Sequence, residues 1–313
     1  MLEAEYRLAK QYFSDIQSID LTKLTIDKYR QSLDPLDNYC FPDQDVSIKQ
    51  KAITARDWIK VKTYFINMDS PSDSVLFFFP GNSFITRLFK PNFNYACHIA
   101  KQANIKCVYV DFRLCPENTI SKCFDDCYDV VKELYQKDEY QLTGHKFILS
   151  GISSGARISA SISATVAKTK DFNIDQLILL NGSYNFDFKG KEYEEFEKKD
   201  PILSKPAANL AKSFMNIDLQ LDDPYISPSF IKLDSNFPNT YILVAEYDGV
   251  RGQSEGFYQK LNENNNPVTK ILLKNQSHNT QFFRGVYQMS NASDKVFVDI
   301  LKGKYQLRRS YTI

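Results

Sequence analysis

Short runs of apolar residues recur along the chain, and longer amphipathic stretches separate them. Six of these runs are typical of strands that are buried on both faces, as parallel strands are. They comprise residues 75–79, 107–110, 147–149, 177–180, 241–245 and 271–273. Residues 57–66 instead alternate, with Ile59, Val61 and Phe65 on one side. This period of two predicts a half-buried strand that precedes the main sheet.

The stretches between the runs carry apolar residues at helical spacing. In residues 121–137, Phe124, Cys127, Val131 and Leu134 recur on one face. Residues 154–168, 253–262 and 295–302 show the same period less strongly. Because strands and helices alternate, we predict an α/β protein with a mostly parallel, doubly wound sheet.

Two segments break this alternation. Residues 1–55 contain helical pieces ahead of the sheet, and residues 183–235 contain four prolines and a charged run at 189–200. We expect both segments to form a helical cap over the strand ends, with residues 56–182 and 236–313 as the core. The charged run by itself is typical of a solvated helix face.

Composition and charge exclude several classes of function. The 313 residues include 39 basic and 38 acidic side chains, which gives a formal net charge of +1. This balance argues against a dedicated nucleic-acid binder, because such proteins usually carry a basic domain or stripe. The first ten residues contain two glutamates and lack the apolar core of a secretory signal. No apolar run approaches the roughly 20 residues that span a bilayer. We therefore expect a cytoplasmic protein without stable membrane insertion, while leaderless secretion stays open.

The cysteines do not form a recognisable metal site. Cys123 and Cys127 could share a helix face, but the chain has no CxxC pair and no histidine near them. We expect the six cysteines to be reduced and mostly buried. They are Cys40, Cys97, Cys107, Cys115, Cys123 and Cys127. No metal and no other cofactor is expected.

Candidate chemistry begins at Gly151-Ile152-Ser153-Ser154-Gly155, which follows a strand and opens a helix of small residues. This context is typical of a nucleophile elbow, in which a sharp turn exposes the central serine. A side chain at either flanking glycine would collide with the neighbouring strand or helix. Ser153 is therefore the candidate nucleophile; the alternative is a glycine-rich turn with a structural serine.

A serine nucleophile needs a base and an acid, which follow it in this architecture in the order Ser, Asp/Glu, His. Of the three histidines, His98 and His145 precede Ser153, so only His278 fits that order. For the acid, Asp248 is preferred to Glu246, because Asp248 lies in the loop beyond its strand. The alternative is that Asp248 is only an aspartate of a surface turn.

Acyl transfer also needs N–H donors for the developing oxyanion. The polar turn at residues 79–84 follows the first buried strand, and the amides of Asn82 and Ser83 are candidate donors. The amide of Ser154, which begins a helix, is the third. The alternative is an ordinary strand-ending turn.

Five segments resemble the hormone-sensitive-lipase-like group of α/β-hydrolases, which includes carboxylesterases. Residues 75–84 are similar to its oxyanion strand and His-Gly-Gly-Gly-Phe signature, and residues 111–117 to its Asp-Tyr-Arg-Leu-Ala-Pro-Glu motif. Residues 151–155 match its Gly-Asp-Ser-Ala-Gly, residues 223–228 its cap-exit segment and residues 246–251 its acid loop.

The resemblance implies an α/β-hydrolase fold with a cap, a triad of Ser153, Asp248 and His278, and an oxyanion hole formed by Asn82, Ser83 and Ser154. It also implies a structural role for Arg113 and Glu117, which would pin the loop behind the oxyanion turn. The chain departs from the family pattern at several positions. These are Pro80, Asn82, Ser83, Ile152 and Asn279.

These observations together predict a serine carboxylesterase that cleaves short to medium acyl esters through an acyl-enzyme. Gly81, Phe84 and Tyr184 are expected to contact a small-molecule ester, as are Phe89 and Phe186 near the mouth, although these aromatic residues could equally be core. A homodimer is left open. The alternatives are a non-catalytic ligand-binding or scaffold protein on the same fold, and an amidase or deacetylase of a larger substrate.

Overall fold

The computed structural model describes residues 24–34, 45–87, 89–188, 193–195, 200, 203, 205–233, 237–283 and 288–313. Within these residues, nine strands form one sheet in the order β1-β2-β4-β3-β5-β6-β7-β8-β9. The strands are β1 (Ile48–Thr54), β2 (Lys60–Ile66), β3 (Ser74–Phe79), β4 (Lys106–Asp111), β5 (Lys146–Ile152), β6 (Gln176–Leu180), β7 (Asn239–Tyr247), β8 (Val268–Ser277) and β9 (Ser310–Thr312).

Strand direction follows the apolar pattern. The pairs from β4 through β3, β5, β6, β7 and β8 to β9 are all parallel, and the six apolar runs lie in β3 to β8. At the other edge, β1 and β2 form an antiparallel pair, and β2 also runs antiparallel to β4. The prediction of a mostly parallel sheet is therefore confirmed.

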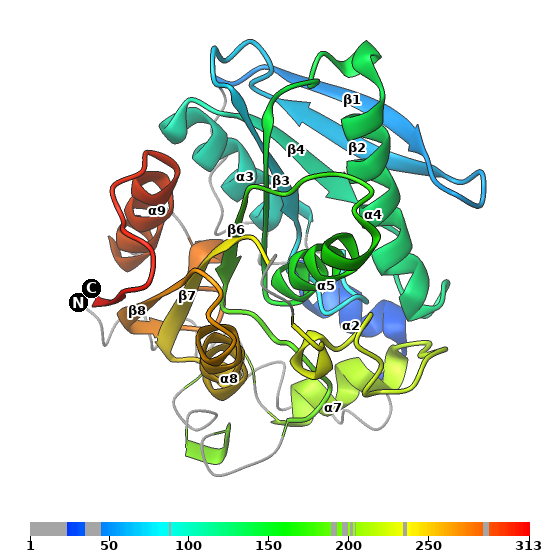
Figure 1. The fold of residues 1–313 in the computed structure, drawn as a ribbon. Coiled ribbons are helices and arrows are strands. Elements are labelled where there is room, and N and C mark those ends of the chain that lie inside the picture. The colour runs from blue at the N-terminus through cyan, green and yellow to red at the C-terminus, as the bar shows by residue number, and fades with distance from the viewer. Residues whose placement is uncertain are drawn as a thin grey trace.

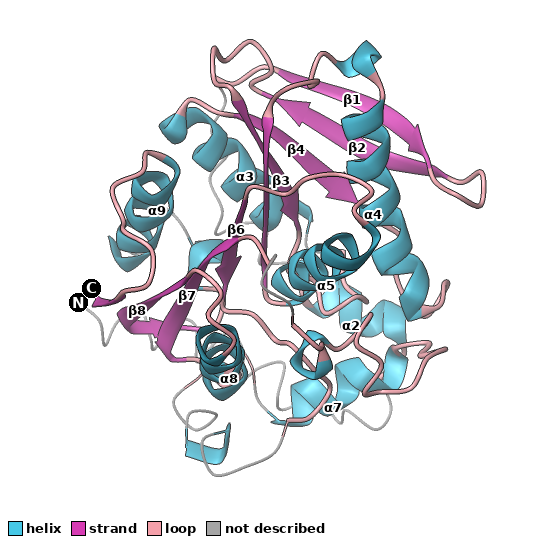
Figure 2. Ribbon diagram, in the orientation of Figure 1, coloured by secondary structure: helices cyan, strands magenta, loops and turns pink. Residues whose placement is uncertain are grey.

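Helices cover both faces of the sheet, with α3 and α9 on one face and α4, α5 and α8 on the other (Figure 2). These helices are α3 (Phe89–Ala103), α4 (Ile120–Gln136), α5 (Ser154–Thr169), α8 (Arg251–Glu263) and α9 (Gln288–Leu301). Four of them contain the stretches with helical spacing. On α4 the predicted apolar face, from Phe124 to Leu134, is fully buried, which is why this helix packs onto the sheet.

Two smaller helices come from the segments that break the alternation. They are α2 (Ile26–Ser32) and α7 (Lys205–Phe214), which lie side by side (Figure 1). Their Tyr29 and Phe214 rings are 6.1 Å apart. Ile120 N–H also donates to the Asn216 carbonyl at 2.8 Å, which joins the residues just after α7 to the start of α4. Short 3-10 turns lie at Asp138–Tyr140, Pro228–Phe230 and Thr280–Phe283.

The N-terminal boundary of the sheet differs from the expectation. Residues 48–54, assigned above to a cap segment, form β1 and pair with β2 from Ile48–Ile66 to Thr54–Lys60. Most side chains of β1 are exposed, Lys49, Gln50 and Lys51 among them. An edge strand of this kind lacks the alternation of a half-buried strand, so its sequence carries no such signal.

The thiols in the described part of the chain are buried. Cys97, Cys107, Cys115, Cys123 and Cys127 form no disulfide, and Cys40 lies outside the described residues. None of the helices in the described part of the chain is long and apolar enough to cross a membrane.

Candidate active site

Ser153 lies in a sharp turn between β5 and α5. Its φ and ψ are 54° and −113°, a strained combination for a residue with a side chain. A Cβ on Gly151 would lie 2.3 Å from the Gly155 carbonyl carbon, and one on Gly155 would lie 2.0 Å from the Phe79 carbonyl oxygen. Both flanking residues must therefore be glycine for β3, β5 and α5 to pack this closely.

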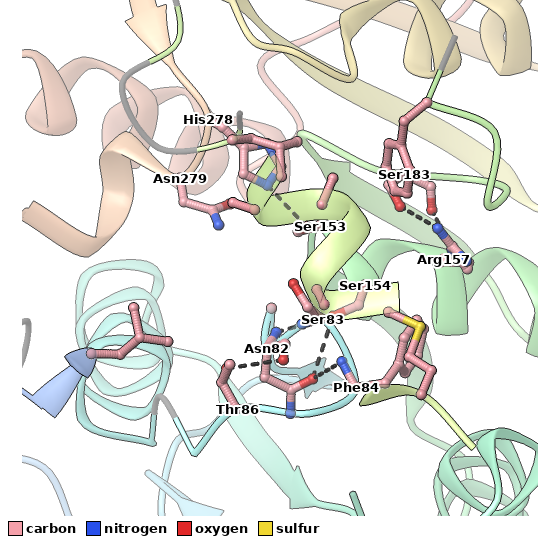
Figure 3. Close-up of a pocket in the computed structure, with 18 of the residues that line it drawn as sticks. Asn82, Ser83, Phe84, Thr86, Ser153, Ser154, Arg157, Ser183, His278 and Asn279 are labelled. Carbon is pink, nitrogen blue, oxygen red and sulfur yellow. Dashed lines mark hydrogen bonds between the residues drawn. The ribbon is translucent and has the colours of Figure 1, made fainter. Parts of the chain in front are cut away.

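His278 faces Ser153 from the carboxyl end of β8. Its Nε2 is 3.0 Å from Ser153 Oγ, the contact drawn between the two side chains in Figure 3. Thr280 holds the loop, because its hydroxyl accepts from Ser277 N–H at 3.0 Å and donates to the Ser277 carbonyl at 2.9 Å. The imidazole is buried, with 2% of the residue exposed.

Asp248 follows β7 and completes the hydrogen-bond chain. Its Oδ1 lies 2.9 Å from His278 Nδ1 and accepts a further bond from Val250 N–H at 2.8 Å. Glu246, the less favoured candidate, instead accepts from Asn275 N–H at 2.8 Å. The structure thus brings together Ser153, His278 and Asp248, the three residues that the sequence singled out.

The other two histidines lie elsewhere. His98 is on α3, with its Nε2 3.4 Å from Asp294. His145 lies just before the amino end of β5, whereas Ser153 follows the carboxyl end of the same strand. Neither is part of the hydrogen-bond chain.

A second buried carboxylate, Asp200, lies beside the pair of Asp248 and His278. Each of the three offers a ligand atom within 4.8 Å of the others. Asp200 Oδ2 accepts from Gly249 N–H at 2.9 Å, while Asp248 Oδ2 is buried without a partner among the described residues. Such a trio could hold a metal ion, but the imidazole nitrogen that faces the carboxylates is already hydrogen-bonded to Asp248, as in a triad base.

Asp200 was missed in the sequence. It ends the charged run at 189–200, most of which lies outside the described residues. Glu194 and Glu195 are exposed, as expected of a solvated face, but Asp200 is only 5% exposed, so for this residue the interpretation was wrong. Its burial depends on the distant acid loop, and no local pattern indicates that contact.

The charges around His278 set its pKa. Burial lowers the pKa, because it penalises the imidazolium, but the negative charges of Asp248 and Asp200 and the hydrogen bond to Asp248 raise it by more. The pKa of His278 therefore lies above its ordinary value of 6.5. A base with a raised pKa binds the serine proton more strongly once Ser153 attacks.

The turn after β3 presents its amides to the first turn of α5. Asn82 N–H and Ser83 N–H point at the Ser154 hydroxyl oxygen, at 3.0 and 3.1 Å. Ser83 and Phe84 adopt positive φ values of 52° and 62°, and the Asn82 side chain supports this shape by accepting from Phe84 N–H at 2.9 Å. The three residues expected to form an oxyanion hole thus lie together, beside Ser153 (Figure 3).

Arg30, on α2, ties this turn to the loop that follows β4. Its guanidinium donates to the Ile85 carbonyl at 2.7 Å, to the Cys115 carbonyl at 2.9 Å and to the Glu117 carboxylate at 2.5 and 2.9 Å. Cys115 N–H also donates to the Phe84 carbonyl at 2.8 Å. Sequence reasoning missed Arg30, because nothing in its local pattern marks a long-range tie.

Arg113 and Glu117 have separate partners. Arg113 binds the carboxylates of Asp126 and Asp57, while Glu117 binds Arg30. Both bonds fix the loop behind the oxyanion turn, in line with the structural role that the resemblance implies.

A small cavity of about 90 Å³ opens in front of Ser153. Gly81, Phe84 and Arg157 contribute to its wall, together with residues of α2 and α7. Tyr184 does not: it is fully buried, and its ring centroid lies 4.4 Å from that of Phe257, on which it stacks. The prediction that Tyr184 contacts the substrate is therefore wrong. The side chain of Phe89 lies outside what the structure describes.

Arg157 anchors the start of the 183–235 segment to α5. It is 2% exposed, donates to the Ser183 carbonyl at 2.7 Å, and lies over the Phe186 ring at 4.2 Å. Burial lowers its pKa to about 9. Phe186 thus contacts the Arg157 guanidinium with its ring and, like Tyr184, is not part of the cavity wall.

Comparisons with known proteins agree with this architecture. A family model described as alpha/beta hydrolase fold matches residues 76–282. An arylesterase of Saccharolobus solfataricus is 22% identical over 282 residues, which cover 88% of this chain and 91% of that protein. A hyperthermophilic esterase from the archaeon Pyrobaculum calidifontis has a TM-score of 0.84 at 17% identity, with 95% of this chain and 97% of that chain covered. An esterase from the bacterial hormone-sensitive lipase family has a TM-score of 0.84 at 14% identity, with 96% and 98% covered.

Proposed function

The chain belongs to the alpha/beta hydrolase fold family, and from that premise we propose that it is a serine carboxylesterase acting on short to medium acyl esters of small molecules. One observation carries the proposal. Ser153, His278 and Asp248 form a continuous chain of hydrogen bonds, with heavy-atom distances of 3.0 and 2.9 Å. A serine at a strained elbow, a base within reach of its proton and a buried acid behind the base are the parts that acyl transfer requires.

In the first half of the reaction, Ser153 Oγ bonds to the ester carbonyl carbon while its proton passes to His278 Nε2. The carbonyl π electrons move to the oxygen, which becomes the oxyanion. Asp248 holds the ring by Nδ1 and stabilises the imidazolium. When the tetrahedral intermediate collapses, the bond to the alcohol oxygen breaks, and that oxygen takes the proton from His278.

In the second half, water bonds to the carbonyl carbon of the acyl-enzyme and gives a proton to His278. Collapse then breaks the bond to Ser153 Oγ, which regains the proton as the carboxylic acid leaves. The amides of Asn82, Ser83 and Ser154 are the proposed donors to the oxyanion at both stages.

The substrate class rests on the cavity and on the relatives. A cavity of about 90 Å³ favours small acyl groups, and Gly81 and Phe84 line it beside Ser153. The relatives that the chain resembles are named as an arylesterase and an esterase. We assign α2 and α7 to a cap over the site, because residues of both helices line the cavity.

Hydrolysis of p-nitrophenyl acetate and p-nitrophenyl butyrate tests the proposal. We expect turnover in the wild type and in Ser163→Ala, which removes a buried hydroxyl from the same helix far from the site. Ser153→Ala should lower kcat roughly 10⁶-fold. No turnover by the wild type, or equal turnover by Ser153→Ala, would overturn the proposal. Matched p-nitroanilides distinguish an amidase, which would cleave them at comparable rates.

A further inference from the structure

The Ser154 hydroxyl oxygen accepts hydrogen bonds from two of the amides that are the proposed donors to the oxyanion. Donors to an oxyanion lie about 2.7–3.1 Å from the position it occupies. Asn82 N–H and Ser83 N–H lie 3.0 and 3.1 Å from Ser154 Oγ, so both amides are hydrogen-bonded to this side chain. Ser154 is 3% exposed and lines the cavity in front of Ser153 together with Asn82 and Ser83.

The Ser154 hydroxyl is also a hydrogen-bond donor. Its acceptor is Asn82 Oδ1, at 3.4 Å, on the side chain that also accepts from Phe84 N–H. Since each N–H needs a lone pair, Ser154 Oγ offers these amides what an ester carbonyl oxygen would offer them. Ser154 Oγ, which is part of the chain itself, thus accepts the hydrogen bonds that a substrate carbonyl oxygen would accept.

We propose that the Ser154 hydroxyl occupies the oxyanion hole of the resting enzyme and must rotate out before the carbonyl oxygen of an ester can enter. This inference rests on the proposed function. Ser154 would then contribute in two opposite ways, its backbone N–H as a donor to the oxyanion and its side chain as a competitor of the substrate.

A tethered occupant differs from a water molecule. A water in the hole is released to the solvent when substrate displaces it, and that release favours binding. The Ser154 hydroxyl gains no such freedom, since it only moves to another staggered rotamer inside a buried site. The cost falls on every substrate that uses the hole, whatever its acyl length.

Ser154→Ala tests the occupant, because it removes the hydroxyl and leaves the backbone N–H in place. In the wild type, the two amides must exchange their bonds to Ser154 Oγ for bonds to the substrate, and this exchange costs about as much free energy as one net hydrogen bond. We therefore expect kcat/KM of Ser154→Ala to be roughly five- to tenfold higher for p-nitrophenyl acetate and butyrate alike. A trifluoromethyl ketone, whose adduct with Ser153 carries an oxyanion, should bind more tightly by the same factor. Ser163→Ala is the matched control and should change neither value.

The outcomes separate this inference from the proposed function. If the wild type hydrolyses esters and Ser154→Ala is equal or slower, the hydroxyl is idle or is itself a donor, and only this inference falls. If neither hydrolyses an ester nor binds the ketone, the proposed function fails and this inference falls with it.

Discussion

The base side and the oxyanion side of Ser153 are held by different kinds of contact. On the base side, Asp248 and His278 follow the neighbouring parallel strands β7 and β8, and short loop bonds such as Val250 N–H to Asp248 fix them. On the oxyanion side, the turn at Asn82 and Ser83 depends on a side chain from far away in the sequence, Arg30.

The two sides also differ in their readiness for reaction. The imidazole is already 3.0 Å from Ser153 Oγ, whereas the amides of Asn82 and Ser83 are bonded to Ser154 Oγ. The fold itself supplies the base, because parallel strands end at one edge of the sheet. The oxyanion hole depends more on individual side chains, so single substitutions there can raise as well as lower the rate.

Replacement of the base should have the largest effect. His278→Gln removes the proton acceptor of Ser153 and leaves a polar side chain in its place. We expect kcat for p-nitrophenyl acetate to fall roughly 10⁶-fold, as for other triad bases. Circular dichroism should show an unchanged fold, and His98→Gln, remote from the site, should keep wild-type turnover. Appreciable activity in His278→Gln would mean that another group accepts the proton.

Loss of the acid should be the next largest effect. Asp248→Asn keeps the shape of the side chain but removes the charge that stabilises the imidazolium and favours the wrong tautomer. We expect kcat to fall roughly 10⁴-fold. The matched variant Glu246→Gln, two residues earlier at the end of β7, should stay near wild type. Equal losses in both variants would mean that Asp248 is not specifically the acid.

Arg30→Ala should weaken the oxyanion side without touching the base. It leaves the buried carbonyls of Ile85 and Cys115 without this donor, so we expect the free energy of unfolding in urea to fall by roughly 3 kcal/mol. The turn should also lose its shape, and kcat should fall in the folded variant. Lys146→Ala, which breaks an exposed ion pair with Asp73, should leave both quantities near wild type. No loss of stability in Arg30→Ala would contradict the tie.

The smallest effect is a displacement of the pH profile. Neutral His278 is the active base and its pKa is raised, so kcat/KM should rise with pH through a midpoint above 6.5. Asp200→Asn removes one of the negative charges that raise this pKa, so the midpoint should move to lower pH. Glu194→Gln, which neutralises an exposed acid in the same segment, should leave it unchanged. A midpoint that Asp200→Asn leaves in place would show that Asp200 does not act on the imidazole.

Much of the fold was predictable because buried parallel strands are apolar throughout. The runs in β3 to β8 show this pattern, and the apolar face of α4 repeats at helical spacing. The strand β1 was not predicted, because its exposed side chains carry no apolar period, and β9 is only three residues long.

The site was predictable where chain order and strand ends define it, as for Ser153, Asp248 and His278. Arg30, Asp200 and the Ser154 side chain were missed for one physical reason. Their roles depend on contacts with residues at least 49 positions away, such as Arg30 with Ile85, Asp200 with Gly249 and Ser154 with Asn82. Tyr184 was placed in the pocket on its aromatic character alone, and that character is equally suited to the core.

The labelling of Ser153 by a fluorophosphonate tests the central claim most directly, since this reaction needs both sides of the site. Ser153 Oγ bonds to phosphorus while its proton passes to His278, the P–F bond breaks and fluoride leaves, and the phosphonyl oxygen enters the oxyanion hole. Peptide mass spectrometry should find the adduct on Ser153 alone, with slower labelling below the pKa of His278 and faster labelling in Ser154→Ala. An unlabelled wild-type protein, or an adduct on another residue, would contradict the account.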